Sequence, residues 1–325
     1  MFILTILGGA VTSSTAQTVS TDSAKTEVRR YTARNFSEER TFNLYWETSP
    51  DRNYHLKQSG QKMERGRIRN KHTVKFSAVI PILDKSQFTL NVKGNANFYK
   101  FDVKNDMPNI PSLINKGAEK LFSYHKIEVN TSYMLNVFQR PLVLQATVSG
   151  DGWNGGFGRV DGTLTALYML NYGERSQFYA GLCFIALYDF LPVLPIIIYS
   201  YQFTPDFYTD ISLPSSAYMR WQFANSHRLS LGMLTDAEMF YCKPRSEQLP
   251  ETALFKLVNL KAELDYEYII NDHFYLIARC GVTKPFESGF FKVNRKGKGV
   301  CSPLVDYSQR ATSFFNIGFS YNIWK

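Results

Sequence analysis

The sequence predicts an all-β protein: a transmembrane antiparallel up-and-down β-barrel of about 14 strands, with 12 as the alternative count. Three observations predict it. Apolar and polar residues alternate along most of the 325-residue chain, and this period of two gives a strand one apolar and one polar face. No apolar run after the N-terminus reaches the roughly 20 residues that a transmembrane helix needs. Short and long connections also alternate along the chain, as they do in bacterial outer-membrane barrels.

Composition and charge narrow the class of protein. The chain has 20 Tyr and 25 Phe, yet its mean hydropathy is only −0.24, which suits strands with one polar face and excludes a bundle of membrane helices. The formal charge of +9 and the pI of 9.2 first suggest nucleic-acid binding. The basic residues are spread among strands and two connections without a nucleic-acid motif, so we expect no nucleic-acid partner.

The N-terminus has the pattern of a secretory signal. An apolar run, Phe2–Val11, is followed by small residues up to Ala16 and Gln17, so residues 1–16 are predicted to be a signal peptide. The run is too short to span a bilayer. Residues 17–40 are polar and mixed in charge, and form either a periplasmic lead-in or a plug inside the lumen. The barrel is predicted over residues 41–325.

Fourteen segments have the alternation of a strand. They are 42–46, 74–80, 88–98, 127–137, 142–148, 162–171, 178–186, 197–203, 207–213, 219–223, 229–233, 258–270, 274–282 and 313–324. The segments at 42–46 and 162–171 are weaker than the others, which is why 12 strands remain an alternative. In the closing segment, Phe315, Ile317 and Phe319 alternate with small or polar residues.

The connections between these segments fall into two sets. Tight turns are expected near Asp84, Arg140, Gly173, Pro205, Asn225 and Asn271. Longer, extracellular connections are expected at Thr48–Lys71, Asp106–Glu119, Asp151–Gly156, Ala237–Thr252 and Lys284–Arg310, with Pro214–Ser216 as a short exception. An even strand count with a periplasmic C-terminus follows, as bacterial barrels require.

Charged residues occupy the second face of three predicted strands. In 258–270 this face carries so many charges that we expect it to see water. With neighbours on 127–137 and 274–282, the predicted lumen wall is Lys126, Glu128, Lys261, Glu263, Asp265, Glu267 and Arg279. Two interpretations stay open: a constriction or binding wall that sets ion preference, or an interstrand salt-bridge lattice that fills the lumen.

A second candidate set lies in the connection 284–310. Lys284, Lys292, Arg295, Lys296 and Lys298 either bind lipid phosphates or anionic ligands, or form a solvated basic loop. The nearby Phe290 and Phe291, together with Trp153, are candidates for the aromatic girdles at the membrane interfaces.

Three short stretches carry a family resemblance. The Ala16–Gln17 junction, the aromatic closing strand and the segment from Leu191 to Phe203 resemble uncharacterised outer-membrane β-barrels of Bacteroidota. The resemblance implies a barrel in a Gram-negative outer membrane, and it carries over no site residues. Such a barrel would have outer-membrane lipid, lipopolysaccharide and the barrel-assembly machinery as partners.

No motif for catalysis or metal binding is present. The five histidines are scattered, and none lies in a G-x-S-x-G or H-E-x-x-H context. The four cysteines lack metal-site spacing, and Cys242 and Cys301 either pair or remain thiols. We therefore expect no enzyme, cofactor or metal.

Three functions remain open. The first is a porin-like barrel that passes small hydrophilic solutes through a polar lumen. The second is a non-conducting surface barrel with a binding or structural role, and the third, less favoured, is an outer-leaflet lipid-modifying enzyme.

Overall fold

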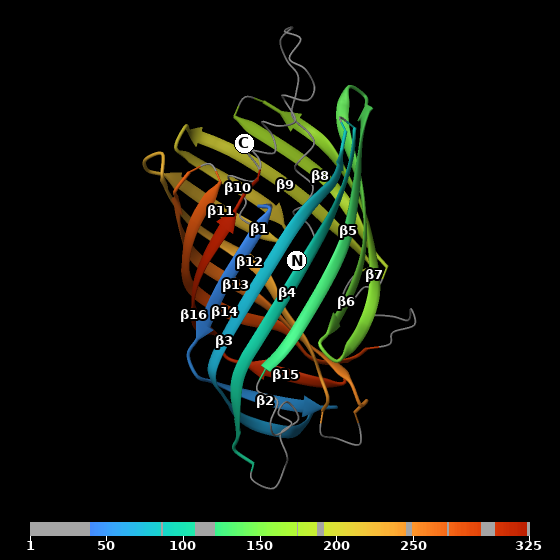
Figure 1. Ribbon diagram of the computed structural model, residues 1–325, viewed down its shortest axis with the longest axis vertical. Helices are drawn as coiled ribbons and strands as arrows, with labels where there is room; N and C mark the ends of the chain where they lie inside the picture. Colours follow the sequence, from blue (N-terminus) through green and yellow to red (C-terminus); the bar gives the residue numbers. More distant parts are fainter. Residues whose placement is uncertain are drawn as a thin grey trace.

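The computed structural model describes residues 40–85, 87–107, 121–173, 175–186, 192–244, 249–271, 273–293 and 303–323 (Figure 1). These residues form sixteen β-strands in one antiparallel sheet. The strands are β1 (Phe42–Ser49), β2 (Arg52–Gln58), β3 (Gln61–Asp84), β4 (Phe88–Asn105), β5 (Leu121–Val137), β6 (Arg140–Trp153), β7 (Gly156–Tyr172), β8 (Ser176–Ile185), β9 (Val193–Thr204), β10 (Phe207–Leu213), β11 (Ser216–Gln222), β12 (His227–Cys242), β13 (Ala253–Ile269), β14 (Phe274–Lys292), β15 (Val305–Gln309) and β16 (Thr312–Tyr321). Among the residues that the structure describes, no helix is long and apolar enough to cross a bilayer.

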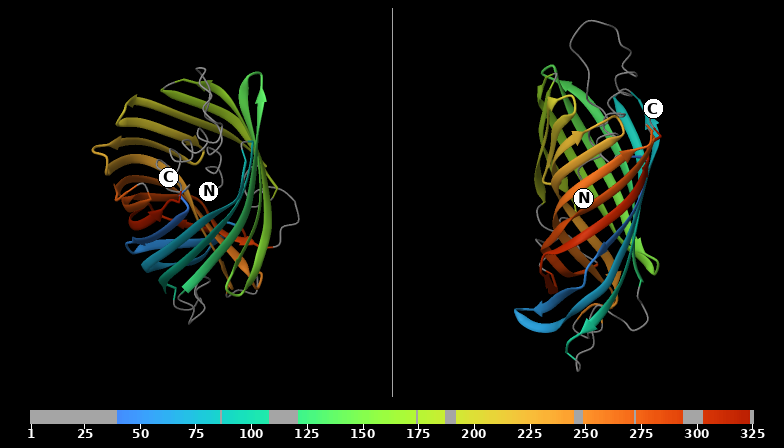
Figure 2. Two further views of the ribbon diagram at one scale, coloured as in Figure 1. Left: turned by 45° about the horizontal axis from the view of Figure 1, so that its top comes forward. Right: turned by 90° about the vertical axis from the view of Figure 1, so that its left-hand side faces the viewer.

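The sheet closes into a barrel at β1, which pairs with β3 on one side and with β16 on the other. Strands β2 and β15 continue the wall beyond β1 and β16 at the end of the barrel away from the C-terminus (Figures 1 and 2). Strands β1 and β2 together act as one barrel strand with a short interruption, and so do β15 and β16. The wall therefore has 14 strands, which confirms the predicted count.

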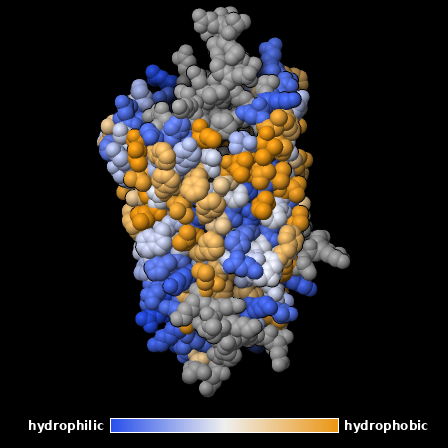
Figure 3. Space-filling view, viewed as in Figure 1, coloured by the Kyte–Doolittle hydropathy of each residue, from blue (hydrophilic) through white to orange (hydrophobic). Residues whose placement is uncertain are grey.

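The two faces of the wall follow the alternation in the sequence. On β13, the Leu264 side chain on the outer face is 41% exposed, whereas Asp265 on the inner face is 3% exposed. Exposed Leu, Ile, Val and Phe side chains on the outer wall form an apolar band across the middle of the face shown in Figure 3. Because hydrocarbon cannot hydrogen-bond to a backbone, a closed antiparallel barrel with an apolar outer band is a membrane-spanning structure. The fold is that of a bacterial outer-membrane barrel.

Aromatic side chains mark both edges of this band. At the end that holds the C-terminus, Phe42, Phe274, Phe319 and Tyr321 contact one another, and Trp221, Phe223, His227 and Tyr268 continue the row. At the opposite edge, the Trp46 ring stacks on His72 with centroids 5.6 Å apart, and Phe98 meets His125 edge to face. Such rings favour the headgroup level of a membrane. They therefore set the depth at which the barrel lies.

Two of the predicted long loops are wrong, and two others are shorter than predicted, because residues 151–153 lie in β6 and residues 237–242 lie in β12. Residues 52–58 and 61–69 lie in β2 and β3, and residues 284–292 and 305–309 lie in β14 and β15. These segments lie beyond the membrane band, where the outer face of a strand meets water. Charged residues such as Arg65, Arg67 and Arg69 can therefore occupy outward positions, and their charge hid the strand pattern.

The turns at the C-terminal end are short, as predicted, and we assign this end to the periplasm. At the outer end, the β10–β11 connection at Pro214 and Ser215 is short, which was the expected exception. Strand β11 pairs with β12 only up to Ser216 and Leu234. Beyond this point β12 pairs with β13 alone and contacts β5 across the barrel. The outer half of the barrel is thereby narrowed.

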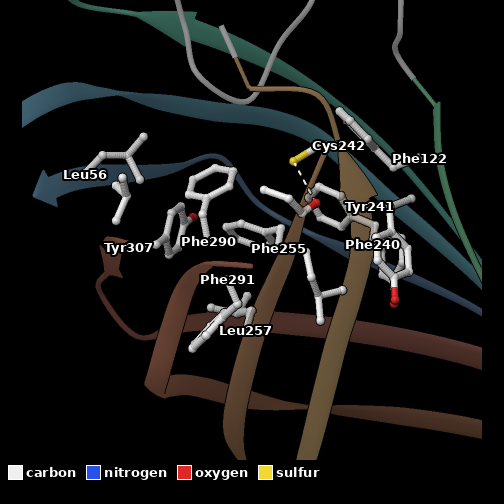
Figure 4. Close-up of a cluster of buried hydrophobic side chains, with 14 of the residues drawn as sticks. Leu56, Phe122, Phe240, Tyr241, Cys242, Phe255, Leu257, Phe290, Phe291 and Tyr307 are labelled. Atoms are coloured by element: carbon white, nitrogen blue, oxygen red, sulfur yellow. Dashed lines mark hydrogen bonds between the residues drawn. The ribbon is translucent and has the colours of Figure 1, made fainter. Parts of the chain in front are cut away.

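The narrowed half has its own core, which we call the outer lobe (Figure 4). Its strands are β2–β5 and β12–β15, which enclose Tyr54, Leu56, Ile68, Tyr99, Phe101, Phe122, Tyr124, Phe240, Tyr241, Cys242, Ala253, Leu254, Phe255, Leu257, Phe290, Phe291, Val305 and Tyr307. Eight strands make a barrel whose interior side chains can just fill. The outer lobe is accordingly packed and not a pore.

Three residues proposed for the interface belong to this core instead. Phe290 and Phe291 are fully buried, and the Trp153 ring packs on Tyr241 at a centroid distance of 4.5 Å. The register of β13 against β14 shifts opposite Phe286, so side chains beyond this point no longer follow the alternation of the membrane segment. The girdle prediction for these residues is wrong because sequence alternation does not show where a register shift lies.

Candidate functional site: the barrel lumen

Strand β13 orders the lumen from the periplasmic end outward. Its inward residues run from Glu267 through Asp265, Glu263 and Lys261 to Asn259, and then to Leu257 in the outer lobe. The alternation predicted in the sequence therefore places a ladder of charges below an apolar core. All seven predicted wall residues face the lumen, and each has at least one ion-pair partner.

The lowest cluster centres on Glu267. Its carboxylate accepts a bond from the Arg40 guanidinium at 3.0 Å and another from Arg228. Arg40 also lies over the Tyr275 ring, 3.7 Å from the centroid. All three charged side chains are almost completely buried. Arg40 precedes β1. Its bond to Glu267 therefore fixes the start of the barrel chain to the lumen wall.

The central cluster joins four strands. The Lys261 Nζ donates to Glu47 on β1 and to Asp236 on β12, at 2.8 Å each. Asp236 also accepts a bond from Lys75 on β3 at 2.7 Å. One position outward, Lys71 pairs with Glu238. Because β12 and β3 are not neighbours in the sheet, these bonds tie opposite sides of the wall together.

A third set lines the adjoining wall. The Arg279 Nε lies 3.1 Å from Asp265 and 3.9 Å from Glu263, and Glu263 also accepts a bond from the Tyr218 hydroxyl at 2.7 Å. On the far side of the lumen, Lys126 pairs with Glu128 at 2.7 Å. The predicted wall residues therefore divide among separate clusters and do not form one ring.

The expectation that this face sees water is wrong for Asp265 and Glu267, whereas Lys261 and Glu263 line a cavity between the clusters. Asp265 and Glu267 are 3% and 1% exposed, because partners on other strands cover them. A charge transferred out of water is stabilised only when an opposite charge and hydrogen bonds replace the lost hydration. Of the two interpretations left open, the salt-bridge lattice describes these residues better.

A cavity with both polar and apolar walls remains between the clusters, and we call it the central chamber. Its volume is about 160 Å³. Its charged and amide lining residues are Asn43, Glu47, Lys75, Lys93, Asn95, Asn97, Lys126, Glu128, Asp236, Lys261, Glu263, Arg279 and Asn316, and its apolar and aromatic ones are Tyr45, Phe76, Tyr124, Leu234, Ala237, Met239 and Phe314. A water takes a share of roughly 30 Å³ in the liquid, so the chamber can hold several waters or one small solute.

Two polar groups of the chamber lack partners among the described residues. Lys93 faces inward from β4 and makes no ion pair with any of them. The Oδ1 atom of Asn316, a residue only 4% exposed, accepts no hydrogen bond within the described part of the chain. Buried polar atoms are nearly always hydrogen-bonded. These two groups can therefore bind water or a solute.

The outer lobe closes the lumen above the chamber along one seam, between β12 and β5. Phe240 packs on Phe122 with centroids 4.6 Å apart. Asp151 on β6 accepts bonds from the hydroxyls of Tyr124 at 2.9 Å and Tyr241 at 2.5 Å. In the part of the chain that the structure describes, β12 and β5 share no ladder of backbone hydrogen bonds. There, side-chain contacts hold this seam, whereas backbone ladders join the other neighbouring strands of the lobe.

The structure describes only part of the predicted basic loop. Lys284 and Lys292 are exposed residues of β14 and not loop residues. Arg295, Lys296 and Lys298 lie outside the described residues, as does Cys301, so the Cys242–Cys301 pairing stays a prediction. The predicted signal peptide and residues 17–39 also lie outside the described residues.

Sequence inspection missed several lumen residues. Glu47, Lys75 and Asp236 each occupy inward positions, and Arg228 and Arg40 complete the lower cluster. The signal for Lys75 was present, because it alternates with the outward Val74 and Phe76. No sequence signal could show that β3 meets β12 across the lumen.

The residues that the structure describes include no group of three or more His, Cys, Asp or Glu arranged to hold a metal ion. Four of the five histidines lie against aromatic rings near the edges of the band. His273 also contacts the Asn322 carbonyl oxygen at 2.7 Å. These positions are those of interface residues.

Comparison with known proteins finds only distant structural likeness. No protein-family model matches, and no curated protein matches. Among solved structures, an outer membrane channel from Pseudomonas putida F1 is 10% identical, with a TM-score of 0.41, over 86% of this chain and 93% of that one. A Pseudomonas aeruginosa FadL homologue is 10% identical with a TM-score of 0.36 (86% and 89% covered), and the KdgM porin is 8% identical with a TM-score of 0.30 (84% and 99% covered). At these values the likeness assigns neither fold nor function to this chain.

Proposed function

We propose that this barrel is a gated channel for small hydrophilic solutes, with the central chamber as its binding site and the β12–β5 seam as its gate. The observation that carries the proposal is the chamber itself, a cavity of about 160 Å³ in the middle of the lumen. Its size suits a small solute, and the charged and amide side chains in its lining suit a hydrophilic one. Lys93, which lacks an ion-pair partner among the described residues, favours solutes that carry negative charge.

The gate is placed at the seam because of how the lobe is built. A β ladder opens only when several backbone hydrogen bonds break together, whereas aromatic contacts and two tyrosine hydroxyl bonds join β12 to β5. Each aromatic pair contributes roughly 0.5–1.5 kcal/mol beyond its burial. The seam is therefore the junction of the outer lobe that can separate at the lowest free-energy cost.

Single-channel recording tests the proposal. The refolded full-length protein is placed in a planar bilayer, and the wild type is compared with Phe240→Ala, which weakens the seam. Phe290→Ala is the matched control, because Phe290 packs on Phe255 in the same core but away from β5. We expect rare openings in the wild type, frequent openings in Phe240→Ala and wild-type behaviour in Phe290→Ala.

Ion selectivity tests the chamber separately. Lys93→Gln removes the cation that lacks a partner, and the reversal potential across a salt gradient should shift toward cation preference. Lys62→Gln removes an exposed cation of the β2–β3 hairpin and should leave the reversal potential unchanged. An identical reversal potential for the wild type and Lys93→Gln would exclude the chamber from the conduction path.

A second candidate function is a non-conducting surface barrel. The packed outer lobe favours it, because the lobe leaves no straight passage above the chamber. If the wild type and Phe240→Ala are both silent while gel mobility shows folded barrels, the channel proposal fails and this second function replaces it.

A further inference from the structure

A cluster of outward-facing cations lies just beyond the membrane band on β3 and β4. Its members are Arg67, Lys100 and Lys104, which we call the cation cluster. All three are exposed, and Arg67 lies directly opposite Lys104 in the antiparallel pair. In Figure 3 the surface below the apolar band at this end is strongly hydrophilic.

The outer aromatic girdle fixes the height of this cluster. Lys100 lies opposite His72, whose ring stacks on Trp46, and two residues beyond Phe98 on the same face. With a rise of about 3.4 Å per residue and a strand tilt of about 40°, Lys100 lies roughly 5 Å outside Phe98. On the same basis the Arg67–Lys104 pair lies roughly 15 Å outside it. The cluster thus spans the height of a lipid headgroup.

The cluster is short of negative charge. Like charges directly opposite each other in an antiparallel pair are destabilising, and none of the three cations makes an ion pair with a described residue. Arg67 bonds only to the neutral Asn53 side chain, at 3.2 Å. Among the described residues nearby, Asp106 pairs with Arg65 and Asp51 with Arg69, and Asp102, between Lys100 and Lys104, accepts a bond from Asn70. Five cations therefore face three carboxylates.

We propose that the cation cluster binds the phosphorylated sugar headgroup of lipopolysaccharide in the outer leaflet. Guanidinium and ammonium groups form strong charge-assisted bonds with phosphate. The position just outside an aromatic girdle selects an anion that is anchored in the membrane over one dissolved in water. The site is on the outer wall, so it is independent of the proposed channel.

Native mass spectrometry of the purified full-length barrel in detergent tests this site. The protein is titrated with a short, deep-rough lipopolysaccharide and with the same lipid after enzymatic removal of its phosphates. We expect the double variant Arg67→Gln/Lys104→Gln to raise the apparent Kd about tenfold or more, which corresponds to the loss of one charge-assisted bond. Removal of the phosphates should weaken binding to the wild type by a similar factor.

A matched control has the same change of charge further from the membrane. Lys57 and Lys62 are also directly opposite each other. Lys57 lies four residues further along β2 than Asn53, the partner of Arg67, which is roughly 10 Å further from the membrane. Lys57→Gln/Lys62→Gln should therefore change the apparent Kd less than about twofold. Equal weakening by both double variants would show a general charge effect and overturn the site.

Two further outcomes would also overturn it: unchanged binding by Arg67→Gln/Lys104→Gln, or equally tight binding of the dephosphorylated lipid to the wild type. The second measurement needs no variant, so the proposal stays testable even if the double variant does not fold.

Discussion

Lys261 is the residue whose removal should reveal most about the lumen. Its Nζ bonds to Glu47 and Asp236 at 2.8 Å each, and all three side chains are at least nine-tenths buried. Lys261→Met keeps the length of the side chain but leaves the Glu47 carboxylate without its ion pair. Removal of one partner of a buried pair typically costs about 3–5 kcal/mol. Asp236 keeps Lys75 at 2.7 Å, so Glu47 accounts for most of this cost.

The double variant Lys261→Met/Glu47→Gln tests the cause. It removes both charges, and replacement of a buried pair by neutral groups is often nearly neutral for stability. We expect the double variant to recover most of the lost free energy of unfolding, with a coupling energy of about 2–4 kcal/mol. Lys62→Met, at an exposed position, should change stability by no more than about 0.5 kcal/mol.

The measurement is reversible urea unfolding of the barrel in lipid vesicles, followed by the heat-dependent shift in gel mobility. A loss below about 1 kcal/mol for Lys261→Met would mean that this ion pair contributes no more than a solvent-exposed one, and the lattice interpretation would then be wrong. A double variant as unstable as the single one would assign the cost to packing and not to the Glu47 charge.

The remaining predictions concern the wall and the seam. Leu264→Arg places a charge on the lipid face and should cost about 2–4 kcal/mol, measured by the same urea titration; a tolerated arginine would reverse the face assignment. Asp265→Asn leaves the Arg279 guanidinium near Glu263 at 3.9 Å, so we expect a smaller loss than from Leu264→Arg in the same assay. Gly318→Ala should cost about 1–3 kcal/mol, because the added Cβ would overlap the Tyr45 ring; unchanged stability would show that the ring can move. Tyr241→Phe removes one of two hydroxyl bonds at the seam, and more frequent channel openings in planar bilayers are expected, with unchanged gating as the contrary result.

The sequence by itself determined the barrel, its strand count and which face of each membrane strand is apolar. A strand in lipid must turn every second side chain toward hydrocarbon, so positions such as Leu264 and Asp265 were assigned to opposite faces correctly. Where the outer face meets water this constraint ends. The sequence pattern therefore predicts loops where the structure has β2, β15 and the outer parts of β3 and β14.

Only the tertiary structure decided what fills the lumen. The Lys75–Asp236 pair joins β3 to β12, and the outer lobe brings Phe122 of β5 onto Phe240 of β12. Alternation shows that a side chain faces inward but not which side chain faces it across the barrel. That depends on the curvature of the wall and on the register shifts, which arise from contacts of the whole chain. The sequence could therefore predict charged residues in the lumen, whereas their pairing, the central chamber and its closed outer end required the closed barrel.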